Sequence, residues 1–127
     1  MATSLNSKRR SREGAIAVEM VFVLPIIFIF FFGLWEWSRV EMIRQVSETA
    51  AFEAARLGTI PGKTATDMED HANRILDLYM ISSADINATV NTVNSEVFIE
   101  VPFEDNTWIS SRIFAGKSAQ TQMKLKK

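Results

Sequence analysis

The 127-residue sequence contains no cysteine and a single histidine, His71. The absence of cysteine excludes disulfides, thiolate nucleophiles and cysteine-ligated metals. One histidine beside Asp67 and Asp70 is typical of a solvated helix face and not of a metal site. There is also no Gly-rich phosphate loop, and no spacing argues for a Ser-His-Asp arrangement. The sequence therefore predicts no catalytic, cofactor or metal site, and a protein that is not an enzyme.

An excess of charge of one sign is lacking too, because 14 basic residues stand against 15 acidic ones. A net charge of −1 gives no case for nucleic-acid binding. The charges are nevertheless uneven, since the first twelve residues are basic and carry no acid. The basic residues of this leader are Lys8, Arg9, Arg10 and Arg12. Its polar composition predicts that residues 1–14 are disordered.

A long hydrophobic run is present, over residues 15–34, with one carboxylate in it. As a helix, this run spans about 30 Å, the thickness of a bilayer's hydrocarbon core. The basic residues before it predict that the N-terminus stays in the cytoplasm. Trp35 and Trp37 follow the run, where amphipathic aromatic residues act as interfacial anchors. We predict a single transmembrane segment at 15–35 in the lipid bilayer, and a head at 36–127 on the far side.

Glu19 is the one carboxylate within the apolar run. At membrane depth a carboxylate costs on the order of 2.5–3.5 kcal/mol at the helix centre, and less near an end. In one interpretation Glu19 simply reaches the head groups. In the other, the chain is cut between Gly14 and Ala15, so that a new α-ammonium group forms one turn before Glu19. The carboxylate then lies in the first turns of a helix, where the helix dipole favours it.

The residues on both sides of the Gly14–Ala15 bond resemble a known family. A basic leader, a glycine and then Ala15-Ile16-Ala17-Val18-Glu19 before an apolar helix are similar to the class III signal of type IV pilins and pseudopilins. More narrowly, three segments resemble TadE-like minor pseudopilins of the Tad (tight adherence) pilus. These segments are Glu13 to Met20, Leu24-Pro25, and Phe32-Gly33-Leu34-Trp35-Glu36-Trp37-Ser38-Arg39. Met20 stands where phenylalanine is usual, and Trp37-Ser38 replaces an aromatic–Gly pair.

This resemblance implies a structural role in the cytoplasmic (inner) membrane of a bacterium. A prepilin peptidase would cut after Gly14, and Glu19, the fifth residue of the mature chain, would order one subunit against the next. The implied partners are the peptidase, other pilins and pseudopilins, and the Tad inner-membrane platform. The protein would be a minor pseudopilin, a structural or assembly component of a Tad pilus or a related secretion system. The alternative is an uncleaved, single-pass, membrane-anchored binding domain.

Helical periodicity continues beyond the apolar run. A stripe of apolar residues at three- and four-residue steps predicts a helix over 36–57. The stripe comprises Val40, Ile43, Val46, Ala50, Ala51, Ala54 and Leu57. Gly58 is a plausible cap, and Pro61 bars continuation. Thr66 and Glu69 form a capping box that predicts a second helix over 66–81.

Alternating apolar and polar residues predict strands in the rest of the head. The expected strands lie at about 85–92, 96–103 and 118–125, the first two joined by a hairpin around 93–95. Residues 108–114 remain open between a short helix and an irregular packed segment. The sum is an α+β protein, in which a long N-terminal transmembrane helix continues into a small pilin-like head with a second helix and an antiparallel sheet of about three strands.

Overall fold

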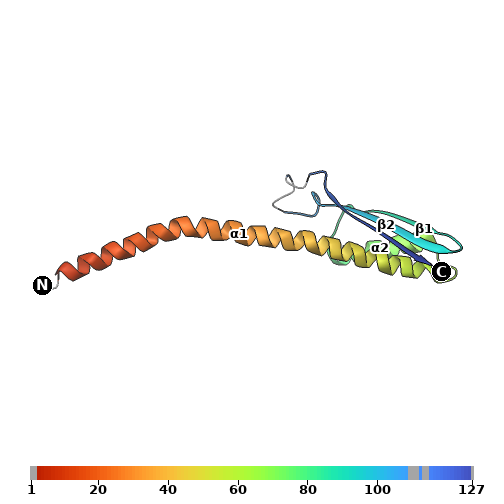
Figure 1. The fold of residues 1–127 in the computed structure, drawn as a ribbon, viewed down its shortest axis with the longest axis horizontal. Coiled ribbons are helices and arrows are strands. Elements are labelled where there is room, and N and C mark those ends of the chain that lie inside the picture. The colour runs from red at the N-terminus through yellow and green to blue at the C-terminus, as the bar shows by residue number, and fades with distance from the viewer. Residues whose placement is uncertain (1–2, 109–111, 113–114, 127) are drawn as a thin grey trace. The chain divides into compact units, whose positions relative to one another are not determined.

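The computed structural model describes residues 3–108, 112 and 115–126, in two helices and three strands (Figure 1). The elements are α1 (Thr3–Gly58), α2 (Ala65–Leu78), β1 (Asp85–Val90), β2 (Asn94–Pro102) and β3 (Ser118–Lys126). The predicted α+β class, with one long N-terminal helix, a second helix and a three-stranded antiparallel sheet, is confirmed. By its internal contacts the chain divides into two units, Met1–Trp35 and Glu36–Lys127. The open question about residues 108–114 falls mostly on 109–111 and 113–114, which lie outside the described residues.

The first unit consists of the N-terminal part of α1. Its backbone is helical from Thr3, whereas composition predicted a disordered leader. Residues 3–13 contain neither proline nor glycine, so nothing in them stops a helix from growing outward from the apolar segment. Helix growth adds one hydrogen bond for each residue fixed, which explains the extension. The helix also continues through Pro25.

The second unit is built on the buried face of α1. The predicted stripe is confirmed, with Ile43, Ala50, Ala51 and Ala54 fully buried. Leu57 is only partly buried, and the neighbouring Gly58 is buried in its place. Two polar residues share this face, Glu36 and Ser47, and the Ser47 hydroxyl donates a 2.7 Å hydrogen bond to the Ile43 carbonyl. A helix face of this kind packs against a partner layer along its whole length.

The N-terminus of α2 lies one residue earlier than predicted and uses a different cap. Thr64 is the N-cap: its hydroxyl accepts from the Asp67 N–H, and its own N–H donates to the Asp67 carboxylate at 2.9 Å. The predicted box of Thr66 with Glu69 is therefore wrong. Glu69 is used elsewhere, because its carboxylate accepts a 3.1 Å hydrogen bond from the Ala88 N–H of β1. That contact covers an edge strand with a helix, which protects the edge from other chains.

The C-terminus of α2 lies at Leu78, not at the predicted residue 81. Met80 adopts a left-handed conformation with φ 55°, its N–H donates to Asp77 O, and the Ile81 N–H donates to Leu76 O at 3.1 Å. These are the two hydrogen bonds of a Schellman motif, and its usual apolar contact is available because Leu76 and Ile81 are both buried. The motif terminates the helix without glycine, so no glycine marks the end of the helix in the sequence.

The sheet has the order β1-β2-β3, with both pairs antiparallel. Along β2 every second side chain is buried, and these are Ser95, Val97, Ile99 and Val101. The hairpin turn lies at residues 91–93 and not at 93–95, because Val90 pairs with Ser95. The Ser95 hydroxyl donates a 2.7 Å hydrogen bond to the Ala55 carbonyl of α1, which fixes Ser95 on the inner face. A one-residue slip would expose that entire face.

Close packing at the C-terminal end of α1 depends on Gly58. A Cβ atom at this position would lie 2.8 Å from Ser95 Cβ and 2.5 Å from Met68 Sδ. The Met68 side chain can rotate away, but Ser95 Cβ is fixed to the backbone of β2. Helix, sheet and second helix therefore meet at a point where only glycine fits without displacement.

Replacing Gly58 with alanine should lower the free energy of unfolding of the head by about 2 kcal/mol. Overpacking of this kind costs about 1–3 kcal/mol, more than the gain in helix propensity returns. The measurement is urea unfolding of the full chain in detergent micelles. Gly33→Ala is the matched control in the same helix, because a Cβ there meets nothing within 4 Å. An equal or greater stability of Gly58→Ala would contradict the packing argument.

Candidate functional site

The residues at the predicted cleavage point lie on an exposed stretch of α1. Gly14 is exposed, and a Cβ added to it would meet nothing within 4 Å. Ala15 follows in the same helix. Glu19 is exposed one turn later, and among the described residues no hydrogen bond or ion pair reaches its carboxylate. The structure thus leaves Gly14 and the Glu19 carboxylate exposed; whether they serve processing and assembly stays a prediction.

The apolar run is also exposed along its whole described length. One helix in the described residues is long and apolar enough to cross a membrane; its most apolar window has a mean hydropathy of 2.6, and none of it is buried in the protein. Its aromatic rings contact one another, with centroids 6.3 Å apart for Phe28 and Phe32 and 5.8 Å apart for Phe31 and Phe32. An apolar helix that the protein does not cover indicates a membrane anchor.

The residues that flank the apolar run also belong to α1. Trp35 and Trp37 are 64% and 68% exposed, and the Trp35 ring lies 6.3 Å from that of Phe31. Their role as interfacial anchors stays a prediction. The basic leader residues Lys8, Arg9, Arg10 and Arg12 belong to the helical backbone of α1. Their predicted cytoplasmic position is likewise untested.

Arg39 is a residue for which the sequence predicted no role. Its guanidinium donates three hydrogen bonds to backbone carbonyls: to Tyr79 O at 3.2 Å, to Met80 O at 2.9 Å and to Asn106 O at 3.3 Å. The first two carbonyls directly follow α2, where a cation is favoured by the helix dipole. Arg39 therefore joins α1 to the end of α2 and to the segment after β2. Its place at the end of the family-like motif was the only available signal.

Asn106 binds the same connecting segments as Arg39, and the sequence predicted no role for it either. Its side-chain carbonyl accepts from the Ser82 N–H at 2.8 Å, and its amide donates to Ser82 O at 2.8 Å and Pro102 O at 2.9 Å. The side chain is buried, and its partners are all backbone groups. We call Arg39 and Asn106 with the carbonyls they bind the junction of the head. It is a structural site, because it satisfies backbone groups in two connecting segments.

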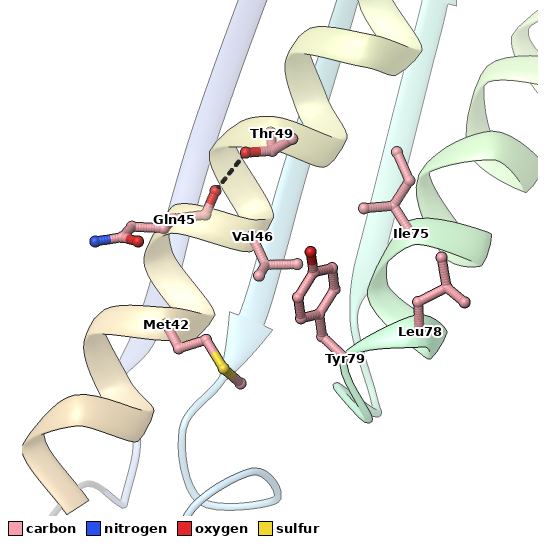
Figure 2. A pocket seen from close by; sticks show the side chains of 7 residues that line it. All are labelled: Met42, Gln45, Val46, Thr49, Ile75, Leu78 and Tyr79. Atoms are coloured by element: carbon pink, nitrogen blue, oxygen red, sulfur yellow. Dashed lines mark hydrogen bonds between the residues drawn. The ribbon is translucent and has the colours of Figure 1, made fainter.

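Two of the hollows in the described part of the head bear on the search for a site. The larger, of about 430 Å³, is an apolar groove between α1 and α2 (Figure 2). Its lining residues are Met42, Gln45, Val46, Thr49, Ile75, Leu78 and Tyr79. Figure 2 shows the Tyr79 ring between Val46 and the end of α2, and the Thr49 hydroxyl donating to Gln45 O at 2.9 Å. The groove offers apolar surface and few polar groups, so its geometry indicates no chemistry.

The smaller hollow contains His71. It has a volume of about 200 Å³ and is lined by Leu57, Lys63, Asp67, Asp70, His71 and Arg74. Both cationic and anionic side chains line it, and the Asp67 carboxylate is already bound to Thr64. In the part of the chain that the structure describes, no group of three or more histidine and carboxylate residues has the geometry of a metal site.

The Asp67 carboxylate has a pKa below its ordinary value of 3.8, because the Thr64 N–H and hydroxyl donate to its charged form. A carboxylate whose pKa is lowered by folding stabilises the folded state above its unfolded pKa. That contribution is lost as the pH falls through the folded pKa. Asp67→Asn should therefore reduce head stability at about pH 7 and make little difference at about pH 2.

Urea unfolding of the full chain in micelles at the two pH values measures this difference. Asp70→Asn is the matched control, since it makes the same charge change on the same helix away from Thr64. The interpretation is contradicted if Asp67→Asn has the same effect at both pH values, or if Asp70→Asn reproduces its pH dependence.

Among the described residues, the exposed apolar helix suggests a membrane anchor that carries a small α+β head. A family model described as TadE-like protein matches residues 14–56. The predicted resemblance to TadE-like proteins is thereby confirmed over most of α1, although the match covers less than half of the chain. A match to this family suggests a component of a Tad pilus. No curated protein and no solved structure matches the chain.

Proposed function

We propose that this protein is a minor pseudopilin of a Tad-type pilus or a related secretion system. It is inserted in the inner membrane with its N-terminus in the cytoplasm and cut after Gly14 by a prepilin peptidase. Residues 15–35 hold it in the bilayer, and the head lies outside the cytoplasm. It then joins other pilins and pseudopilins through the exposed helix and contacts the inner-membrane platform.

One observation carries this proposal: the uncovered apolar run of α1, in which Glu19 is the one acid, lies within the TadE-like match. The matched residues begin at Gly14, so they include the proposed cleavage point and the carboxylate five positions later. An unpaired carboxylate near a membrane segment needs a partner, and such residues by default point to a function. A new α-ammonium group on Ala15 of the same or a neighbouring subunit would supply that partner.

The test is the N-terminal sequence of the mature protein after co-expression with a prepilin peptidase. We expect a start at Ala15. Gly14→Leu should block the cut and leave the leader attached, because a bulky side chain precedes the bond while the helix accommodates it without a clash. Gly33→Leu is the matched control, an equally uncrowded glycine outside the cleavage signature, and should still be cut.

A protein that retains its leader with an active peptidase would support the alternative, an uncleaved membrane-anchored binding domain. A protein that begins after Trp35 would contradict both readings, because the apolar segment would then be an ordinary signal peptide. A catalytically inactive peptidase, expressed at the same level, shows that any cut depends on that enzyme.

A further inference from the structure

The contacts that join α1 to the rest of the head include one group at each end of the head. At one end, Arg39 contacts the carbonyls of Tyr79, Met80 and Asn106, so the segments that follow α2 and β2 meet the part of α1 nearest residue 36. At the other end, Gly58 packs against Met68 and Ser95, near the starts of α2 and β2. Between residues 39 and 58 the helix rises about 28 Å, which separates the two ends.

Large apolar side chains project into solvent mainly at the first of these ends. Among the described residues of the head, the four most exposed large apolar side chains are Trp108 at 91%, Met80 at 83%, Leu78 at 80% and Trp37 at 68%. Each lies within two residues of Arg39, Met80 or Asn106, the residues that form the junction. We call these four side chains the apolar rim.

Among the residues that the structure describes, the far end of the head has no equivalent set. Its exposed apolar residues are Ile60 and Val93, at 49% and 55%. At the rim, by contrast, the chain turns at Met80, which has a left-handed backbone conformation. Both Met80 and Leu78, two residues earlier, have exposed side chains. The Arg39 hydrogen bonds then hold that turn in place. Clustered, nearly complete exposure of such side chains marks an interaction surface.

We propose that the apolar rim inserts into the interfacial layer of the same lipid bilayer that holds residues 15–34. The inference rests on the proposed function, because it requires that segment to be in a membrane. Arg39 follows Trp35 by four residues, which span at most about 14 Å even when fully extended. The rim is therefore tethered close to the bilayer surface however the two units are arranged.

The chemistry of the rim fits the interfacial layer of a bilayer. Tryptophan favours the boundary between head groups and acyl chains, where its ring is apolar and its N–H remains hydrated. Leu78 and Met80 are apolar enough to enter the upper acyl region. Glu104 and Asp105 lie in the same connecting segment as Trp108 and give no attraction to anionic lipid. The surface expected to bind the rim is therefore zwitterionic, and insertion is driven by apolar burial.

The experiment uses full-length variants that each contain a single tryptophan, reconstituted in phosphatidylcholine vesicles. It measures the quenching of tryptophan fluorescence by brominated acyl chains. The Trp108 reporter carries Trp35→Phe and Trp37→Phe. The membrane reference carries Trp37→Phe and Trp108→Phe, which leaves Trp35. The matched far-end reporter carries Ile60→Trp together with phenylalanine at all three natural tryptophan positions. The same samples are titrated with acrylamide, which quenches indoles in contact with water.

We expect brominated lipid to lower the fluorescence of Trp35 and Trp108 by about twofold or more, and to leave the Ile60→Trp reporter unquenched. Acrylamide should quench the fluorescence of the Ile60→Trp reporter more strongly than that of Trp108. Adding Leu78→Ser and Met80→Ser to the Trp108 reporter should reduce the lipid quenching of Trp108, since these changes remove two other apolar side chains of the rim.

Each of the other possible results shows whether the rim proposal or the membrane anchor itself has failed. If Trp35 is quenched by lipid and Trp108 by acrylamide alone, the anchor stands and the rim does not insert. If Trp108 is protected from both quenchers, the rim is covered by protein, such as a second copy, and the lipid proposal is overturned. Quenching of the Ile60→Trp reporter to the same extent as Trp108 would show a head lying on the membrane without selective insertion. A Trp35 reporter that lipid does not quench would overturn the anchor itself.

Discussion

Replacing Glu19 with alanine is expected to leave membrane insertion and cleavage after Gly14 intact, and to lower incorporation into pili by up to about a hundredfold. A carboxylate without a partner costs on the order of 2.5–3.5 kcal/mol at the centre of a membrane helix, and less near an end, where Glu19 lies. Pairing with the α-ammonium group of a neighbouring subunit removes that cost and satisfies the ammonium as well. The central value of about 3 kcal/mol sets the upper limit of the effect at about a hundredfold change in association, because 1.4 kcal/mol is tenfold.

The measurement compares the amount of the protein in sheared pili with the amount in the membrane fraction, in cells that lack the natural copy. Glu41→Ala is the control for the loss of one negative charge on the same helix. Glu41 lies 3.9 Å from Arg44 in a partly exposed ion pair, of the kind that contributes little. We expect Glu41→Ala to be incorporated normally. Normal incorporation of Glu19→Ala would exclude the pairing role and favour a carboxylate that only reaches the head groups.

The parts of the fold that could be predicted from sequence are those with local periodicity. The buried face of α1 follows from residues three and four apart, such as Ile43 and Ala50, and the buried face of β2 follows from alternation through Val97 and Ile99. The apolar segment follows from its length and composition. In each case neighbours along the chain carry the signal, so no knowledge of the tertiary structure is needed.

The start of α2 shows why boundaries are harder to predict. Two overlapping boxes are present, Thr64 with Asp67 and Thr66 with Glu69, and local chemistry does not choose between them. The structure uses the first, because the carboxylate of Glu69 accepts from Ala88 on β1, nineteen residues away. A long-range contact thus decides a local feature. The shifted hairpin has a similar cause, since the buried contact of Ser95 with Ala55 of α1 spans 40 residues.

The residues of the candidate site differ in the same way: some belong to a local sequence pattern, and others act through long-range contacts. Gly14 and Glu19 could be singled out because their spacing matches a pattern that is read along the chain. Arg39 was visible only as the last residue of that pattern, and its partners are 40 to 67 residues away. Asn106 lies in a loop of ordinary composition, and nothing near it in the sequence indicates that its amide is buried. Both act by satisfying backbone groups, a role that leaves no motif.

Replacing Asn106 with alanine is expected to lower the free energy of unfolding of the head by about 3 kcal/mol. The substitution removes three buried or partly buried hydrogen bonds, each contributing about 1 kcal/mol, and leaves the Ser82 N–H and the carbonyls of Ser82 and Pro102 without this partner. The loss should appear first as faster amide exchange at Ser82, because that N–H is the one donor the side chain accepts from.

Two further variants separate hydrogen bonding from packing at this position. Asn106→Asp has nearly the same shape but cannot donate to the carbonyls of Ser82 and Pro102, so it should destabilise the head at neutral pH although its volume is preserved. Asn87→Ala removes an exposed asparagine with a single 3.2 Å hydrogen bond to Asp85, and should change stability by less than about 0.5 kcal/mol. Urea unfolding of each full-length variant in micelles gives the values. A stable Asn106→Asp variant would show that the site needs only volume, and the junction would then be a packing feature and not a network of backbone hydrogen bonds.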